Sequence, residues 1–224
     1  MPLFSESDVR KQYEEFSHEK NEILNNLKNI IIDSKTPLEG NSFYAHETLS
    51  LYPELYTKQV NLFWCGKNAS SRICEIGFNA GHSAMLMLLG RDKTPVDFTI
   101  FDIGHHAYTS PCLKYIETKF SNVNFEYIEG NSILTMSKWI SDNPSLVGTY
   151  DLIHVDGGHT EECIINDMKH ADILVKKGGV IVVDDTGCSH INSTTNDYIN
   201  TGKYTELDVL TTYGYVHRVI QKIL

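Results

Sequence analysis

The sequence has few basic residues, no long apolar run and few cysteines, and each of these absences excludes a class of protein. Nineteen Lys and Arg stand against 29 Asp and Glu, so the net charge is −10, and no basic cluster is present to bind nucleic-acid phosphates. No apolar run reaches the roughly 20 residues of a membrane-spanning helix, and residues 1–6 lack the features of a signal peptide. We therefore expect neither a nucleic-acid partner nor a membrane protein.

The five cysteines are scattered along the chain and contain no Cys-x-x-Cys pair. Their odd number argues against a disulfide framework, and their spacing predicts no zinc site. We expect reduced thiols and a cytoplasmic location. With 41% hydrophobic and 21% charged residues, the composition is that of an ordinary globular protein, and 224 residues suffice for one domain with a full-sized core.

The N-terminal part of the chain has two helical patterns separated by breaks. Residues 5–33 carry apolar side chains at helical spacing, and residues 46–65 form a second helical segment. The aromatic side chains between 44 and 64 can either stack over a sugar ring or simply pack between helices. We expect residues 1–68 to be a helical extension of the domain that residues 69–224 form.

From residue 71 onward, short apolar runs alternate with helical patterns. The expected strands are 72–77, 97–103, 122–129, 150–156 and 179–185, and the expected helices are 82–90, 108–120, 131–142 and 159–176. This alternation predicts an α/β fold with a mainly parallel sheet that helices cover on both faces. The tail differs, because the β-rich runs 205–213 and 215–223 meet at Gly214 as in a hairpin.

The most informative segment is Ile73 to Ser83, which reads Ile-Cys-Glu-Ile-Gly-Phe-Asn-Ala-Gly-His-Ser. An apolar run, an acidic residue and two glycines four positions apart predict a strand, a tight loop and a helix N-terminus. Such a loop receives nucleotide-like ligands in α/β sheets, although glycines after a strand can also serve only to make a turn. The spacing differs from the Gly-x-Gly-x-x-Gly of dinucleotide-binding proteins.

Two further strand ends carry polar residues suited to an adenosine ligand. Asp102 ends the second expected strand, where a carboxylate can accept hydrogen bonds from both ribose hydroxyls or remain a solvated strand end. Asn131 and Ser132 follow the third strand. They can lie near an adenine ring, cap the helix that begins there, or do both.

Three carboxylates follow the last two strands of the alternating series. Asp156 comes after the apolar run 150–155, and Asp184 and Asp185 come after the run 179–183. If these strands are neighbours, the carboxylates converge at the ligand-binding edge, where their repulsion requires a cation. All-oxygen ligation suits Mg²⁺ first, with Mn²⁺ or Ca²⁺ as alternatives. Otherwise only one or two of them point inward and the rest cap loops.

Together, these segments resemble class I S-adenosylmethionine (SAM)-dependent methyltransferases, and among them the metal-dependent O-methyltransferases of small molecules and sugars. The matching motifs run from about residue 70 to 190 in the family's order. The resemblance implies a Rossmann-like, seven-stranded sheet of order 3-2-1-4-5-7-6 with the last strand antiparallel. It implies Asp156, Asp184 and Asp185 as metal ligands. The implied cofactor-binding residues are Glu75, Gly77, Asn79, Gly81, Ser83, Asp102, Asn131 and Ser132.

The predicted catalytic residues are His159 and Asp156. His159 lies three residues after Asp156 at the start of an expected helix, and we expect it to act as the general base. Its alternative roles are a structural hydrogen bond or a fourth metal ligand. Sugar enzymes of this type often have a second acidic residue here, where this chain has Gly157-Gly158-His159. His105 and His106 are expected near the cofactor or substrate mouth, without a chemical role.

The expected reaction is transfer of the SAM methyl group to a hydroxyl of a small molecule, with a sugar diol ahead of a catechol as acceptor. A non-catalytic SAM-binding regulatory protein and a nicotinamide-dependent oxidoreductase are the alternatives. The convergent carboxylates argue against the first and the glycine spacing against the second. A homo-oligomer is compatible with the sequence, which does not specify it.

Overall fold

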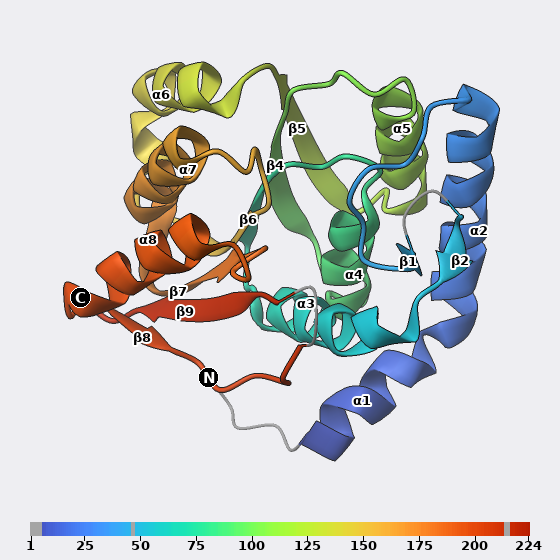
Figure 1. The fold of residues 1–224 in the computed structure, drawn as a ribbon, viewed down its shortest axis with the longest axis horizontal. Helices are drawn as coiled ribbons and strands as arrows, with labels where there is room; N and C mark the ends of the chain where they lie inside the picture. The colour runs from blue at the N-terminus through green and yellow to red at the C-terminus, as the bar shows by residue number, and fades with distance from the viewer. Residues whose placement is uncertain (1–5, 46–47, 213–215) are drawn as a thin grey trace.

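A seven-stranded sheet lies at the centre of the computed structural model, which describes residues 6–45, 48–212 and 216–224 (Figure 1). Its strands, in the order β5-β4-β3-β6-β7-β9-β8 across the sheet, are β3 (Arg72–Ile76), β4 (Val96–Asp102), β5 (Val123–Glu129), β6 (Tyr150–Val155), β7 (Val175–Val183), β8 (Tyr204–Glu206) and β9 (Arg218–Lys222). Strands β3 to β7 pair in parallel, whereas β9 is antiparallel to both β7 and β8. Counted from β3, this is the predicted order 3-2-1-4-5-7-6, so the α/β prediction is confirmed.

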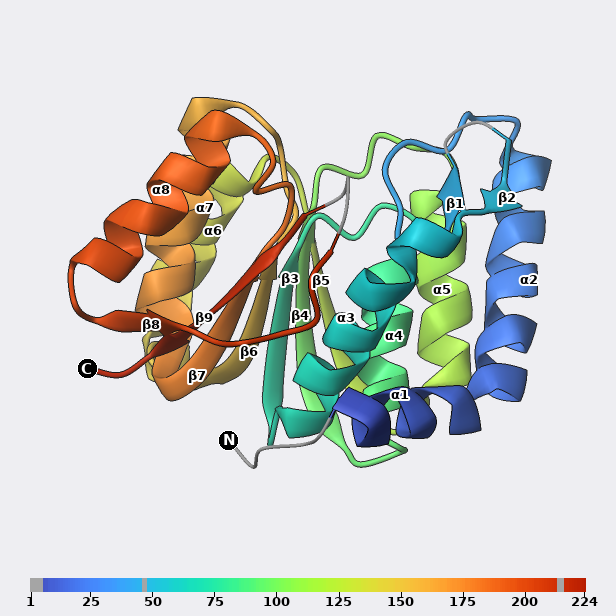
Figure 2. The same cartoon turned by 60° about the horizontal axis from the view of Figure 1, so that its bottom comes forward.

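Helices cover both faces of this sheet (Figure 2). One face carries α6 (Ser132–Asp142), α7 (Glu161–Leu174) and α8 (Ser189–Asn200). The other carries α3 (Tyr56–Asn68), α4 (His82–Gly90) and α5 (Thr109–Lys119), with α1 (Glu6–Glu15) and α2 (Ser17–Ser34) outside them. None of the described helices is both long and apolar enough to cross a membrane.

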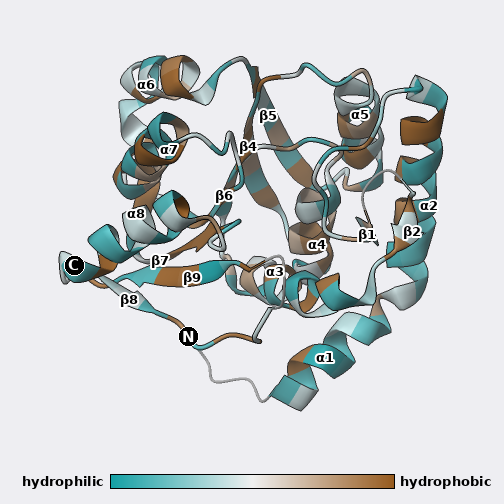
Figure 3. Ribbon diagram, viewed as in Figure 1, coloured by the Kyte–Doolittle hydropathy of each residue, from teal (hydrophilic) through white to brown (hydrophobic). Residues whose placement is uncertain are grey.

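The sheet separates two apolar cores, and alternate residues of each strand point into opposite cores. Along β3, Ile73 packs into the core beneath α3 and α4, whereas Cys74 and Ile76 pack into the core beneath α6 and α7. The apolar colouring of the central strands in Figure 3 follows from this two-sided burial. Two polar side chains, Glu75 and His154, occupy strand positions on the α3 and α4 side and are completely buried.

The N-terminal region differs from the prediction in its element boundaries. The helix expected over 5–33 is two helices, α1 and α2, with Phe16 between them. In place of one helix over 46–65, the chain has the short strand β2 (Ser50–Leu51), the 3₁₀ turn η1 (Pro53–Leu55) and then α3. Pro53 favours the first position of such a turn, because its fixed φ suits a helical start and its missing N–H is not needed there. Strand β2 pairs with β1 (Tyr44–Ala45), and residues 46 and 47 lie outside the described part.

Helices α3 and α4 pack with their backbones in contact. A Cβ atom on Gly66 of α3 would lie 2.1 Å from the Met87 carbonyl oxygen, and one on Gly90 of α4 would lie 2.1 Å from the Phe63 carbonyl oxygen. Glycine at both positions therefore permits the close approach of the two helices. The predicted domain boundary after residue 68 coincides with the end of α3, and stays a prediction.

The C-terminal region holds one element that the sequence patterns did not predict. Helix α8 lies between β7 and β8 and is rich in Ser, Thr and Asn, which are weak helix formers. The strand expected over 205–213 is only three residues long, Tyr204–Glu206, and residues 207–212 form no strand. Strand β9 lies within the expected run 215–223, and Gly214 falls outside the described residues.

Candidate active site

The carboxyl ends of three central strands lie level with one another. The Asp156 N–H donates to the Ile76 carbonyl at 2.9 Å, and the Asp184 N–H donates to the Val155 carbonyl at 3.0 Å. These hydrogen bonds extend the parallel pairing one residue beyond β3, β6 and β7. The glycine loop and the acidic segments after β6 and β7 are thus brought to one edge of the sheet, as the sequence predicted.

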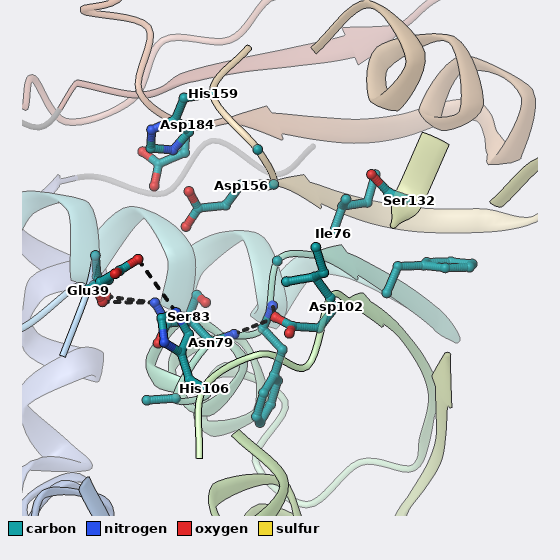
Figure 4. A pocket seen from close by; sticks show the side chains of 18 of the residues that line it. Glu39, Ile76, Asn79, Ser83, Asp102, His106, Ser132, Asp156, His159 and Asp184 are labelled. Carbon is teal, nitrogen blue, oxygen red and sulfur yellow. Dashed lines mark hydrogen bonds and ion pairs between the residues drawn. The ribbon is translucent and has the colours of Figure 1, made fainter. Parts of the chain in front are cut away.

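A cavity of about 670 Å³ lies over this edge (Figure 4). Most of the predicted site residues line it, namely Gly77, Asn79, Ser83, Asp102, Asn131, Ser132, Asp156, His159, Asp184 and Asp185. Glu75 and Gly81 do not line it. Residues 39–42 and Lys58 complete the wall from the N-terminal side, and no sequence motif had pointed to them.

The two loop glycines are required by packing within the protein. Gly77 has φ +92°, and a Cβ atom there would lie 1.9 Å from the Asp156 carbonyl oxygen. Gly81 has φ +77° at the start of α4, and its Cβ would lie 2.5 Å from the Phe78 ring. Both positions therefore exclude a side chain before any ligand is considered.

Asp102 holds the glycine loop in shape and also faces the cavity. Its Oδ2 accepts from the backbone N–H groups of Phe78 and Asn79, each at 2.8 Å, and its Oδ1 accepts from Gly104 N–H at 2.7 Å. A carboxylate has about four lone-pair sites, so acceptor capacity remains for a ligand hydroxyl. The side chain is 8% exposed, in keeping with its place in the cavity wall.

Glu75 does not line the cavity, but it contacts a residue that does. Its Oε1 accepts from the Ser83 hydroxyl at 2.5 Å and lies 3.0 Å from His154 Nδ1. Burial raises the pKa of Glu75, and the His154 contact opposes that rise. Glu75 therefore acts on the cavity through Ser83, which lines it.

Asn131 and Ser132 combine the two roles that the sequence left open. The Asn131 side chain accepts from Ile133 N–H at 3.0 Å and caps α6, and both residues line the cavity. Behind them, burial raises the pKa of Asp167 in α7 to about 6, although the neighbouring Ser132 opposes the rise.

The three carboxylates fall into two groups that share Asp156. One group joins Asp156, Asp184 and His154, and the other joins Asp156, Asp185 and His159, with the ligand atoms of each group within 4.8 Å of one another. The Asp185 backbone has φ +51°, a left-handed conformation that is unusual for Asp, and its N–H donates to Asp184 Oδ1 at 3.0 Å. This turn directs the two adjacent carboxylates into different groups.

Lys58 supplies a positive charge that the sequence analysis missed. It reaches from α3 and forms a buried ion pair with Asp184 Oδ2. Burial alone would raise the pKa of Asp184, but the adjacent Lys58 ammonium lowers it. Burial, reinforced by the charge of Asp184, raises the pKa of Asp156 well above its usual value. The signal in the sequence that could have revealed this charge was a lysine at the start of residues 58–63, which are buried in α3.

His154 is the second group that the sequence analysis missed. Its Nδ1 contacts Glu75, and its other side faces Asp156 and Asp184. Burial lowers the pKa of His154, but the hydrogen bond to Glu75 and the charges of Asp156, Glu75 and Asp184 together outweigh burial and raise it. A titratable residue within the wholly buried strand β6 was the signal that could have revealed it.

His159 lines the cavity and is labelled in Figure 4. Its side chain is 58% exposed, and its Nε2 is 2.8 Å from Asp185 Oδ2. This hydrogen bond raises the pKa of His159. The structure therefore joins the predicted base to one of the predicted metal ligands.

The aromatic segment between 44 and 64 packs inside the protein. Phe63 contacts the rings of Tyr13 and Phe16, and Tyr44 contacts the ring of His82. None of the aromatic residues in this segment that the structure describes lines the cavity itself. Tyr44 only contacts His82, which does line it. The helix-packing alternative therefore accounts for them.

The strand order and the loop geometry at this edge define the class I methyltransferase fold. The chain matches the family described as methyltransferase domain over residues 74–186, half of its length, and it belongs to that family. The resemblance to class I SAM-dependent methyltransferases that the motifs indicated is thereby confirmed.

Similar solved structures agree on the fold. A TDP-rhamnose 3'-O-methyltransferase of calicheamicin biosynthesis is 13% identical, with a TM-score of 0.61 over 91% of this chain and 94% of that one. A Bacillus cereus O-methyltransferase in complex with SAH is 14% identical, with a TM-score of 0.61 over 91% of both chains. A putative caffeoyl-CoA O-methyltransferase from Staphylococcus aureus is 16% identical, with a TM-score of 0.59 over 96% of this chain and 100% of that one. No curated protein matches the chain in sequence.

Proposed function

We propose that this methyltransferase transfers the methyl group of SAM to a hydroxyl oxygen of a small molecule. The proposal rests on one observation, which is that a single cavity is lined by both sets of predicted residues. The cavity runs from Asp102 and the glycine loop to Asp156, His159 and Asp185. A cofactor held at the first end and an acceptor held at the second would meet inside it, and such positioning accounts for much of the rate of a two-substrate reaction.

In this proposal, Asp102 accepts a hydrogen bond from a ribose hydroxyl with its remaining acceptor site, and Asn131 and Ser132 lie beside the adenine. Asn79 and Ser83 face the rest of the cofactor, while Glu75, Gly77 and Gly81 shape the loop. Asn79 Oδ1 supports this placement. It is buried without a hydrogen-bond partner among the described residues, as expected of an acceptor whose donor comes from a ligand.

The acidic groups also fit a divalent cation. Asp156, Asp185 and His159 offer two carboxylate oxygens and one imidazole nitrogen within 4.8 Å, a set that suits Mn²⁺ better than Mg²⁺ or Ca²⁺. Asp184 remains a proposed third carboxylate ligand, although Lys58 already compensates one of its oxygens. A cation held there would lower the pKa of an acceptor hydroxyl and orient it.

The protein's own groups can take the proton that the acceptor loses. As the acceptor oxygen bonds to the methyl carbon, the carbon–sulfur bond breaks and leaves S-adenosylhomocysteine. When it is free of a cation, Asp156 is suited to receive the hydroxyl proton, because burial and the charge of Asp184 raise its pKa and make it a stronger base than an ordinary carboxylate. His159 is the alternative base when its Nε2 is free of both a cation and a proton.

For the acceptor we favour a sugar diol over a catechol. The sugar is supported by the Asp-Asp pair at 184–185, whereas the fold is shared with both a TDP-rhamnose methyltransferase and a putative caffeoyl-CoA methyltransferase and does not separate the two acceptors. None of the described aromatic residues of the 44–64 segment lines the cavity, so this segment supplies no stacking platform for an aromatic acceptor. A non-catalytic SAM-binding role is the rival, and it gives no function to the carboxylates.

Calorimetry with S-adenosylhomocysteine and with NAD tests the cofactor assignment. We expect binding of the first and none of the second, and the reverse would refute the proposal. A methyl-transfer screen against sugars and catechols, run with EDTA and then with added Mn²⁺ or Mg²⁺, tests the reaction. Turnover that persists in excess EDTA would show that the carboxylates act without a cation.

A further inference from the structure

A second cluster of side chains that could bind a metal lines the same cavity, and it shares no residue with the acidic groups. Glu39, His105 and His106 have their ligand atoms within 4.8 Å of one another, and His106 Nε2 is 3.6 Å from Glu39 Oε2 (Figure 4). The proposed methyl transfer uses none of these three. We propose that they form a binding site for a transition-metal cation, with Zn²⁺ as the best fit.

The ligands come from two segments that are already held in place. The His106 ring stacks on Tyr108, with centroids 4.8 Å apart and planes 7° apart, and its side chain is only 9% exposed. The Glu39 N–H donates to the Tyr108 hydroxyl at 3.4 Å, and the Glu39 carbonyl accepts from Asn79 Nδ2 at 2.8 Å. Tyr108 therefore fixes both an imidazole and the backbone of the carboxylate ligand, which reduces the ordering cost of binding.

The chemistry of the donor set selects the ion. Two imidazole nitrogens and one carboxylate are the protein ligands of open zinc sites, in which a fourth position holds water. Mg²⁺ and Ca²⁺ prefer oxygen ligands, so a set with two histidines disfavours them. The cysteine spacing could not reveal this site, because the site contains no thiolate ligand.

The position of the cluster gives the ion a structural consequence. Glu39 belongs to the segment that covers the cavity from the N-terminal side, whereas His105 and His106 follow Asp102 on the loop after β4. A cation bound by all three joins these two parts of the cavity wall. Segment 39–42 would then open less readily than in the metal-free protein.

Metal titrations of the purified chain test the site. An Asp156→Asn/Asp185→Asn variant removes the carboxylate that both acidic groups share and one carboxylate more, and in that background we expect one equivalent of Co²⁺ to bind with visible d–d absorption and to be displaced by Zn²⁺. His106→Ala or Glu39→Gln should weaken binding by more than about 100-fold, beyond the usual cost of losing an outer-shell partner. His18→Ala, an exposed histidine on α2, is the matched control and should change nothing.

Circular dichroism of each variant establishes that it is folded. His105→Ala, at an exposed position, serves as the third ligand test if His106→Ala unfolds. Absence of Co²⁺ binding in the double-Asn background would overturn the proposal, and so would binding that survives all three ligand substitutions. Because no step measures methyl transfer, the result is independent of whether the proposed reaction is correct.

Discussion

Lys58 places a fixed positive charge among carboxylates that otherwise repel one another. The ion pair with Asp184 is almost fully shielded from water, with 5% and 1% of the two side chains exposed. A buried pair of this kind costs desolvation when it forms, but removing one partner strands the other charge. The cation requirement inferred from the sequence is therefore met in part by the protein itself.

Substituting Lys58 by Met should destabilise the protein by about 3–5 kcal/mol, because Asp184 would remain buried without its partner. Urea unfolding in EDTA measures the loss. Added Mn²⁺ should stabilise Lys58→Met more than the parent, since a bound cation would replace the missing charge. Lys67→Met, at an exposed position of the same helix, is the control, and an equal loss there would contradict this account.

Asp102 couples the loop backbone to the cavity through one carboxylate. Asp102→Ala should weaken S-adenosylhomocysteine binding by about 1.5–3 kcal/mol, because hydrogen bonds to a charged acceptor are lost. Asp102→Asn retains one acceptor oxygen and should lose less. Calorimetry measures both affinities, and unchanged binding by the alanine variant would exclude the ribose role.

His159 can be separated from the metal ligands by substitution. If it accepts the hydroxyl proton, His159→Ala should lower kcat by roughly 10²–10⁴-fold while S-adenosylhomocysteine affinity stays constant. Steady-state kinetics and a Mn²⁺ titration are measured on the same preparation. Loss of Mn²⁺ binding would instead identify His159 as a ligand, in line with its grouping with Asp156 and Asp185. Normal turnover would leave Asp156 as the base.

At the scale of elements, α3 connects the N-terminal helices to the carboxylates of the candidate site through Lys58. It lies against α4 at Gly66 and Gly90, and it carries Lys58 to Asp184. The glycine loop leads directly into α4, so the packing of the two helices brings Lys58 and the glycine loop to the same cavity.

Gly66→Ala tests this helix contact. Its Cβ would meet the Met87 carbonyl at 2.1 Å, and backbone cannot yield as a flexible side chain does. We expect a loss of about 1–3 kcal/mol from overpacking, despite the helix preference of alanine. Thermal unfolding measures it against Lys67→Ala at the adjacent exposed position. A stability equal to or above that of the control would show that the helices can separate without cost.

At the scale of the whole molecule, burial of Asp167 makes stability depend on pH. Its pKa of about 6 in the folded protein lies above its ordinary value of 3.8, so the folded state binds the proton more tightly than the unfolded state. Stability from this group is therefore present at low pH and is lost as pH rises through about 6. The penalty above that pH is at most about 3 kcal/mol.

Asp167→Asn should accordingly raise the free energy of unfolding at pH 7–8 and leave it nearly unchanged at pH 4. Urea unfolding across this range gives the profile. Asp33→Asn, at an exposed position of α2, controls for the change in net charge and should show no such dependence. An Asp167→Asn profile parallel to that of the parent would contradict the assignment.

The sequence alone determined the alternation of strands and helices, the strand order and the edge where the polar residues gather. The alternation and the edge follow from local periodicity and from turn residues, which act over a few positions, whereas the strand order was implied by the resemblance to class I methyltransferases. It could not determine α8, whose Ser, Thr and Asn residues favour caps and turns, and which forms through packing against α7 and β8. The sequence could not determine the length of β8 either, because strand length depends on the strand with which it pairs.

Only the tertiary structure decided what surrounds each predicted residue. Lys58 lies 126 positions from Asp184 in the chain, and Glu75 lies 79 from His154, so no local pattern joins them. The glycines at 77 and 81 were predicted, but their reason, contact with the Asp156 backbone and the Phe78 ring, required the fold. Periodicity specifies which face of an element is buried, and only packing specifies which distant charge it meets there.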